Sequence, residues 1–277
     1  MSDHDFQADL RIAHAMADAA RVAIAPYFRT RLDVENKLSA GFDPVTQADR
    51  ASETAMRELL SRQAPQDAIL GEEFGTSAGT GTGTGSGTGP GTGERRWVLD
   101  PIDGTRAFIA GLPTWTVLIA LEVAGKPLLG VIDQPHIGER FSGWPGGAHY
   151  SRADVSQPLA VSTCRALDQA ILASTDPYLF DVAERDAFEA VRSTSRLCRF
   201  GFDAYAYAML ASGGVDLVVE SGLQIYDVQA LIPVVTGAGG VVTNWRGGDP
   251  SAGGQVVAAA NQELLEQALE RLAPAAL

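Results

Sequence analysis

The spacing of apolar residues predicts two amphipathic helices at the start of the chain. In residues 5–29, apolar side chains recur at steps of three and four, the period of a helix that packs one face on a core. A second helix is expected to begin near Thr46, because Thr46 followed three residues later by Asp49 resembles a capping box. The residues expected on its inner face are Ala51, Ala55 and Leu59.

The pattern changes to short apolar runs of strand type between residues 67 and 150. The run 67–71 is followed by two glutamates, and a later run is ended by Asp100-Pro101, so we expect Asp100 at the carboxyl end of a strand. Residues 76–94 are almost entirely Gly and Thr, a composition that cannot bury a core and predicts a flexible surface loop. An antiparallel meander is predicted by three further runs at 114–123, 128–133 and 139–143.

Beyond about residue 150, strand-like and helix-like segments alternate, which is typical of α/β structure. The expected strands are 170–173, 196–200, 215–220, 240–244 and 255–259. The expected helices are 180–192, 203–212, 226–238 and 261–272. We therefore expect two closely joined halves: an N-terminal α+β half, residues 1–150, and a C-terminal α/β half, residues 151–277.

Composition narrows the class of protein. A hydrophobic fraction of 45% in 277 residues is enough for a large buried core. The net charge of −13 argues against nucleic-acid and anionic-membrane partners, because both require a basic patch. No run of eighteen apolar residues occurs and the chain begins with acidic residues, so we expect a cytoplasmic protein. Cys164 and Cys198 lack paired spacing, which favours free thiols over a disulfide framework.

The segment Asp100-Pro-Ile-Asp-Gly-Thr105 concentrates candidate chemistry. It carries two carboxylates, an exposed carbonyl and the start of a helical segment within six residues. Magnesium is usually held by one or two carboxylates plus substrate phosphate, and a helix start offers N–H groups to an anion. An isolated Asp-Pro-x-Asp-Gly is nevertheless more often an ordinary turn than a metal site. The motif therefore depends on other acids that can reach it.

Four such acids occur elsewhere in the chain. Glu72 and Glu73 follow a predicted strand, and adjacent strand residues point to opposite faces, so only one of them is expected to meet Asp100. Asp49 and Asp227 lie at predicted helix starts, where capping is the simpler explanation for each. Cations held by these acids would reverse the local sign of charge and let an acidic protein bind phosphate.

Taken together, these motifs resemble the inositol monophosphatase family. The motifs are Gly71-Glu72-Glu73, Asp100-Pro-Ile-Asp-Gly-Thr105, Tyr226-Asp227 and Asp43-Pro-Val-Thr-x-x-Asp49, all in the expected order. The resemblance covers nearly the whole chain. It implies a layered αβαβα sandwich of the inositol monophosphatase and fructose-1,6-bisphosphatase type, frequently a homodimer. It also implies a magnesium-dependent phosphomonoesterase with two or three Mg²⁺ ions per active site.

The resemblance assigns two sets of metal ligands by matching position. Glu72, Asp100 and the carbonyl of Ile102 would hold the first magnesium ion. Asp100, Asp103 and Asp227 would hold the second. Such an arrangement permits direct attack on phosphorus by a metal-activated water, and metals about 3.5–4 Å apart can stabilise both the attacking and the leaving oxygen.

The resemblance also assigns the remaining roles. Thr105 with Glu72 would position the attacking water, and the N–H groups of Gly104 and Thr105 would hold phosphate oxygens. Asp49 corresponds to an acid beside this water network. Glu220, seven residues before Asp227, corresponds to a side chain that touches the non-phosphate part of the substrate, so both are counted as substrate-binding. Lys37 corresponds to a basic residue near an additional, weaker metal position, and Glu73 is a further accessory candidate.

The substrate is expected to be a small phosphorylated metabolite. Segments 130–135, 138–141 and 34–37, together with Tyr226 where many inositol phosphatases have Trp, are most similar to the histidinol-phosphatase branch. Histidinol phosphate carries a cationic amino alcohol that suits an acidic pocket containing Glu220. Two alternatives stay open: an inositol-1-monophosphatase, and a non-enzymatic module that binds magnesium or phosphate. Intact Thr105 and Glu72 argue against the second, because binding alone needs no poised water.

Overall fold

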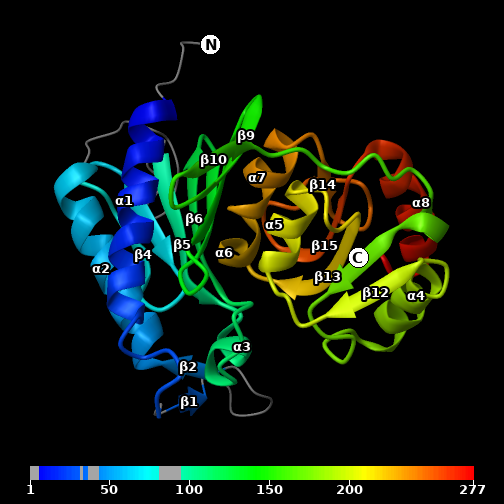
Figure 1. The fold of residues 1–277 in the computed structure, drawn as a ribbon, viewed down its shortest axis with the longest axis horizontal. Helices are drawn as coiled ribbons and strands as arrows, with labels where there is room; N and C mark the ends of the chain where they lie inside the picture. The colour runs from blue at the N-terminus through cyan, green and yellow to red at the C-terminus, as the bar shows by residue number, and fades with distance from the viewer. Residues whose placement is uncertain (1–5, 32–33, 37–43, 81–94) are drawn as a thin grey trace.

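A computed structural model describes residues 6–31, 34–36, 44–80 and 95–277. Five layers follow one another across the molecule (Figure 1): two helices, an eight-stranded sheet, a central layer of helices, a five-stranded sheet and an outer pair of helices. This is the αβαβα order that the resemblance to the family implies. Among the described residues, no helix is long and apolar enough to span a membrane.

The eight-stranded sheet has the order β10-β9-β8-β7-β6-β5-β3-β4. Its strands are β3 (Ala68–Gly71), β4 (Gly75–Ser77), β5 (Arg95–Asp103), β6 (Thr116–Val123), β7 (Lys126–Gln134), β8 (Glu139–Trp144), β9 (Gly147–Arg152) and β10 (Val155–Pro158). The pairs from β5 to β10 are antiparallel, as the predicted meander requires, whereas β3 and β5 are parallel. A separate two-stranded sheet joins β1 (Val34–Asn36) to β2 (Pro44–Thr46).

The five-stranded sheet has the order β12-β11-β13-β15-β14. Its strands are β11 (Ile171–Ser174), β12 (Leu197–Phe200), β13 (Leu217–Leu223), β14 (Val241–Thr243) and β15 (Gly254–Ala259). β11 is parallel to both β12 and β13, so the carboxyl ends of these three strands meet at one edge. All five strands fall within two or three residues of the predicted positions. The division of the chain at residue 150 stays a prediction, and the first sheet continues to Pro158.

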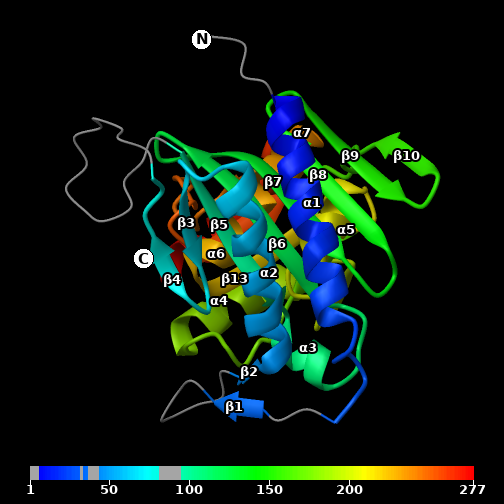
Figure 2. The ribbon, with the colours of Figure 1, turned by 90° about the vertical axis from the view of Figure 1, so that its left-hand side faces the viewer.

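Helices fill the three remaining layers (Figures 1 and 2). The helices are α1 (Phe6–Ile24), α2 (Gln47–Gln63), α3 (Thr105–Ile109), α4 (Val182–Arg192), α5 (Tyr205–Ala211), α6 (Ile225–Val228), α7 (Leu231–Gly237) and α8 (Gln262–Leu272), with short 3₁₀ turns at Leu167–Gln169 and Ala273–Ala275. α1 and α2 cover the outer face of the first sheet, α5 to α7 lie between the sheets, and α4 and α8 cover the second sheet.

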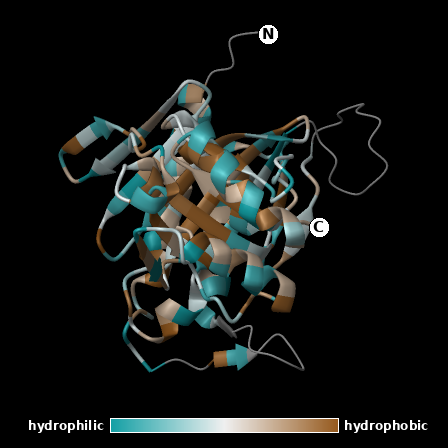
Figure 3. Cartoon of the chain, turned by 90° about the vertical axis from the view of Figure 1, so that its right-hand side faces the viewer, coloured by the Kyte–Doolittle hydropathy of each residue, from teal (hydrophilic) through white to brown (hydrophobic). Residues whose placement is uncertain are grey.

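Three apolar clusters hold the layers together. One lies between α1, α2 and the first sheet and contains Trp97 and Trp115, and another lies between α4, α8 and the second sheet around Trp245. The central cluster joins side chains of both sheets with those of α5 to α7. Figure 3 shows hydrophobic strands inside and hydrophilic positions on the helices that cover them. The sheets are therefore packed against a common middle layer, which fixes their facing edges.

Four predictions of local structure need correction. The helix predicted over 5–29 ends at Ile24, because Pro26 follows and disfavours helical backbone before it. The helix predicted over 226–238 is two helices, α6 and α7, and Pro233 lies in the first turn of α7, where no N–H partner is needed. The loop predicted over 76–94 begins inside β4, and its residues 81–94 lie outside the described part of the chain.

The fourth correction concerns the inner face of α2. Ala51, Ala55 and Leu59 are only partly buried, and the buried face is displaced by one position. Its members are Ala48, Asp49, Ser52, Glu53, Met56 and Leu60. Half of these buried residues are polar, so the spacing of hydrophobic residues does not predict this face. Polar groups are tolerated there because each has a hydrogen-bond partner, as described below.

Candidate active site

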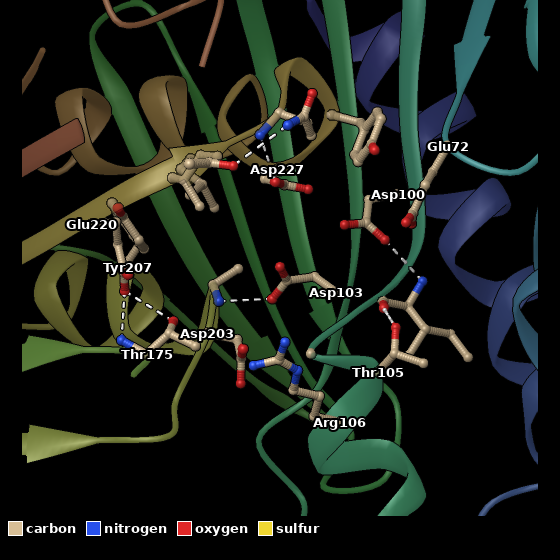
Figure 4. A pocket seen from close by; sticks show the side chains of 18 of the residues that line it. Glu72, Asp100, Asp103, Thr105, Arg106, Thr175, Asp203, Tyr207, Glu220 and Asp227 are labelled. Carbon is tan, nitrogen blue, oxygen red and sulfur yellow. Dashed lines mark hydrogen bonds between the residues drawn. The ribbon is translucent and has the colours of Figure 1, made fainter. Parts of the chain in front are cut away.

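A cavity of about 490 Å³ opens where strand ends of the two sheets face each other (Figure 4). One wall is formed by the turn after β3 and by the end of β5, and the other by the ends of β11 and β13 and by the turn after β12. In each sheet the strands concerned are mutually parallel. Ligands of α/β proteins bind at the carboxyl ends of such strands, so the cavity lies where the fold favours binding.

The end of β5 contains a bulge instead of the predicted strand end at Asp100. Asp100 pairs with Leu118 and Asp103 with Thr116, so three steps along β5 match two steps along β6. In a regular strand, residues three apart point to opposite faces. The extra residue in the bulge lets the side chains of both Asp100 and Asp103 line the same cavity.

The residues after the bulge form a tight turn into α3. Gly104 has a φ of 80°, and a Cβ at this position would lie 3.2 Å from the Asp203 carboxylate, so both conformation and space favour glycine. The hydroxyl of Thr105 donates to the carbonyl of Ile102 at 3.0 Å, and an Asp100 oxygen accepts the Ile102 N–H at 3.0 Å. This turn fixes the backbone between the two aspartates.

Glu72 reaches the same wall from the neighbouring strand. β3 runs parallel to β5 with Gly71 beside Leu99, and the Glu72 N–H donates to the Leu99 carbonyl at 3.1 Å. Glu72 therefore follows β3 at the level at which Asp100 follows Leu99, and the two carboxyl groups are close enough for Glu72 to raise the pKa of Asp100. Glu73 does not line the cavity, which agrees with the expectation that only one of the two glutamates faces Asp100.

Asp227 arrives from the second half of the chain, on α6. One of its oxygens accepts the Gln224 N–H at 2.7 Å, so it caps the helix as the simpler explanation required. It is also part of an acidic cluster: Asp100, Asp103 and Asp227 each offer a carboxylate oxygen, and these oxygens lie within 4.8 Å of one another. Asp227 thus both caps α6 and belongs to the acidic cluster.

The electrostatics of this cluster fit a hard divalent cation. Burial raises the pKa of Asp100 well above its usual value, and repulsion from Glu72, Asp103 and Asp227 adds to the effect. Burial likewise raises the pKa of Asp103, with repulsion from Asp203 and Asp227. Crowded carboxylates are strongly unfavourable without a countercharge, and an all-oxygen donor set is what magnesium prefers. The residues present therefore suit the metal that the resemblance implies.

Asp49 does not line the cavity. Its Oδ2 accepts the Thr46 N–H at 2.8 Å and the Thr46 hydroxyl at 2.6 Å, which completes the predicted capping box of α2. Burial is the largest cause that raises the pKa of Asp49, to about 6. Its role beside the water network stays a prediction. Lys37, an accessory candidate, lies outside the described residues.

Glu220 stands on the opposite wall, near the end of β13. It is almost completely buried, and its Oε1 accepts the N–H of Thr175 at 2.8 Å and the Thr175 hydroxyl at 2.9 Å. Burial raises the pKa of Glu220 to about 8, against which the Thr175 hydrogen bonds act. This carboxyl therefore faces the cavity from the side opposite Glu72, as its expected contact with the non-phosphate part of a substrate requires.

Sequence analysis missed Asp203, which follows β12 and lines the same wall. Its φ is 48°, burial raises its pKa to about 6, and the positive charge of Arg106 opposes that rise. Arg106 lies 4.0 Å from Asp176, which follows β11. The signal was available, since Asp176 and Asp203 both come shortly after predicted strands, where ligand-binding residues gather.

The chain is similar to known phosphatases in both sequence and structure. A model of the inositol monophosphatase family matches residues 5–275. The chloroplastic bifunctional phosphatase IMPL2 of Arabidopsis thaliana is 39% identical over 282 residues, 98% of this chain and 77% of that protein. A histidinol-phosphatase of Streptomyces coelicolor is 36% identical, covering 88% of this chain and 89% of the relative. The solved structure of an inositol monophosphatase from Zymomonas mobilis has a TM-score of 0.83 and 38% identity, covering 98% of this chain and 99% of that one, which confirms the predicted fold.

Proposed function

This chain belongs to the inositol monophosphatase family, and from that premise we propose that it is a magnesium-dependent histidinol-phosphatase. The proposed reaction converts L-histidinol phosphate and water to L-histidinol and phosphate. The observation that carries the proposal is the cluster of Asp100, Asp103 and Asp227 oxygens within 4.8 Å, beside Glu72 and open to the cavity.

The first wall of the cavity is proposed to hold the metal and the phosphate. Glu72, Asp100 and the Ile102 carbonyl would bind one Mg²⁺ ion, and Asp100, Asp103 and Asp227 another. When bound, magnesium supplies positive charge to the phosphoryl oxygens and lowers the pKa of water. Because a carbonyl oxygen has two lone pairs, that of Ile102 can accept from Thr105 and still serve as a ligand.

The same wall is proposed to orient the reacting groups. The Thr105 hydroxyl and the Glu72 carboxylate would hold the attacking water in line with the phosphorus. The N–H groups of Gly104 and Thr105, at the entry to α3, would donate to phosphate oxygens. Positioning of this kind lowers the entropic cost of bringing the reactants together.

The second wall is proposed to receive the leaving group. Glu220 and Asp203 line it, and Asp176 lies next to Arg106 at its edge. Asp203 and Asp176 against one guanidinium favour a cationic leaving group such as histidinol over a neutral polyol such as inositol, and Glu220 adds a hydrogen-bonding carboxyl group. The similarity to named histidinol-phosphatases supports the same choice.

A substrate panel tests the proposal directly. Initial rates are measured with L-histidinol phosphate and myo-inositol 1-phosphate, each with magnesium and with a chelator. We expect kcat/KM for L-histidinol phosphate to be higher by at least about tenfold, a difference of about 1.4 kcal/mol, and no turnover without metal. The reverse ranking would support an inositol-1-monophosphatase, and absence of turnover with both would support the non-enzymatic binding module.

The remaining parts of the proposal concern stoichiometry and assembly. We propose two or three Mg²⁺ ions per active site, a homodimer and a cytoplasmic location, with a small phosphorylated metabolite as the only expected partner. Equilibrium titration with magnesium and sedimentation of the purified chain would measure the first two.

A further inference from the structure

A buried carboxylate on α2 contacts the turn that presents Glu72. The side chain of Glu53 is completely buried. Its Oε2 accepts the N–H of Glu73 at 2.7 Å, and its Oε1 accepts the N–H of Phe74 at 3.3 Å. Glu53 therefore binds the two peptide groups that come directly after Glu72, although it lies about twenty residues earlier in the chain.

The Arg57 guanidinium holds this carboxylate in place from the next turn of the same helix. Its Nε donates to Glu53 Oε1 at 2.7 Å. Its other nitrogens donate to the Gly75 carbonyl and to the Ser77 hydroxyl, both on β4. Glu53 and Arg57 are thus hydrogen-bonded to both the turn and the second strand of the β3–β4 hairpin. The Arg57 side chain is largely buried as well. Charge-assisted hydrogen bonds of this kind are stronger than neutral ones and more sensitive to geometry.

The carboxylate is also in contact with the end of β3. A Cβ built on Gly71 would lie 2.0 Å from Glu53 Oε1, so the strand can approach this closely only because residue 71 is glycine. Glu72 is the next residue. Its backbone is consequently fixed on one side by the Leu99 carbonyl and on the other by Glu53.

The same helix touches the other ligand-bearing segment. The hydroxyl of Ser52, adjacent to Glu53, donates to the Pro101 carbonyl at 3.3 Å, inside the bulge between Asp100 and Asp103. One face of α2 therefore contacts both turns from which the first wall of the cavity is made. These contacts are polar and directional, whereas packing alone would leave the turns free to slide.

We propose that Glu53, held by Arg57, is a positioning residue that sets the direction of the Glu72 carboxylate and so the affinity of the site for magnesium. The proposal rests on the proposed role of Glu72 as a metal ligand. Glu53 itself does not line the cavity. Partners that orient ligands typically change metal affinity by about 10- to 100-fold when they are replaced.

Glu53→Gln tests this with direct binding of Mg²⁺ to the metal-free protein, measured by isothermal titration calorimetry. Glutamine has one acceptor oxygen, so it cannot accept from Glu73, Phe74 and Arg57 together. We expect magnesium to bind about tenfold or more weakly. The matched control is Asp216→Asn. Asp216 is a buried carboxylate at the far end of β13 that accepts the Ile171 N–H at 2.7 Å, so its replacement should lower stability and leave magnesium binding unchanged.

A double-mutant cycle separates positioning from general loss of structure. If Glu53 acts through Glu72, Glu53→Gln weakens magnesium binding in the wild-type chain and adds nothing further in a Glu72→Gln chain. Unchanged binding in Glu53→Gln, equal weakening in Asp216→Asn, or additive losses would each overturn the positioning role. Wild-type protein that binds no magnesium would instead overturn the proposed function itself.

A second variant covers the case in which Glu53→Gln does not fold. Arg57→Met keeps most of the buried side-chain volume and removes the hydrogen bonds to Glu53 and to β4. We expect magnesium binding that is weaker by a smaller factor than in Glu53→Gln, about threefold. Wild-type affinity in this variant would contradict the proposal.

Discussion

The two walls of the cavity are formed in the same way, but their acidic residues have different surroundings. Each wall consists of residues within three positions of the carboxyl ends of parallel strands: Glu72 and Asp100 in the first sheet, Thr175, Asp203 and Glu220 in the second. On the first wall the acids crowd together and repel one another. On the second wall Asp203 and Glu220 also repel each other, but each has its own supporting group: Thr175 donates two hydrogen bonds to Glu220, and the positive charge of Arg106 acts on Asp203.

The difference suggests a division of labour within one cavity. Acids that repel one another are stable only with a cation between them, so the first wall is suited to metal and phosphate. Acids that are separately supported remain available to a ligand, so the second wall is suited to discriminate between leaving groups. Replacing a carboxylate by its amide on one wall or the other therefore tests the comparison with almost no change of shape.

The largest effect is expected for Asp100→Asn, on the first wall. Loss of a charge shared by both proposed metal positions should lower kcat/KM by about 1,000-fold or more, because several kcal/mol of charge stabilisation disappear. The chain should still fold, and its thermal midpoint without magnesium should not fall, since repulsion with Glu72 and Asp103 is relieved. Steady-state kinetics measure the fall in kcat/KM, and thermal unfolding measures the midpoint. Retained turnover would refute the metal assignment.

An intermediate effect is expected for Asp203→Asn, on the second wall. Asparagine tolerates the positive φ of this position, so the backbone should be kept. We expect kcat/KM for L-histidinol phosphate to fall by about fivefold to tenfold, the size of one partly exposed charge pair, with little change for a phosphate ester of a neutral alcohol. Equal losses for both substrates would show that Asp203 does not select the leaving group.

The smallest effect is a dependence of stability on pH that differs between the walls. The pKa of Glu220 is raised from 4.5 to about 8, so the folded state binds the proton more tightly than the unfolded chain. Stability should therefore fall as pH rises from about 4.5 to about 8. Asp100 and Asp103, whose pKa values are also raised, act in the same direction without magnesium.

Saturating magnesium should separate the two contributions. Bound cations favour the charged forms of Asp100 and Asp103 and remove their part of the slope, whereas the part due to Glu220 remains and should disappear in Glu220→Gln. Thermal midpoints at pH 5, 6.5 and 8, with magnesium or with a chelator, provide the measurement. A slope that magnesium leaves unchanged would argue against cation binding at the first wall.

The sequence predicted the first wall better than the second, for a physical reason. Asp100 and Asp103 are close in the chain, and Glu72 follows a neighbouring apolar run, so strand periodicity and the family motifs both point to them. Asp227 was found only through the motif, because its position in the chain indicates no more than a helix cap. The positions of most strands and helices followed from the apolar pattern, whereas the layered architecture was implied by the resemblance to the family.

The rest depends on tertiary contacts that no local pattern encodes. The bulge in β5 arises from pairing with β6, so Asp100 was wrongly expected to end its strand. Ser52 and Glu53 on the polar inner face of α2 have hydrogen-bond partners 20 or more residues away in the chain. The apolar periodicity of the sequence selected Ala51 and Ala55 instead. The position of Asp203 after a predicted strand was a local signal, but its place opposite Gly104 follows only from the packing of the two sheets.

The bulge in β5 implies that this segment is more sensitive to length than to composition. Ile102 contributes a carbonyl to the cavity while its side chain packs in the core, so another aliphatic residue there should be accepted. Inserting one residue into β6 between Thr116 and Leu118 would restore regular pairing with β5 and turn one of the two carboxylates toward the opposite face of the sheet. A chain lengthened in this way would keep every acid and still lose the pair.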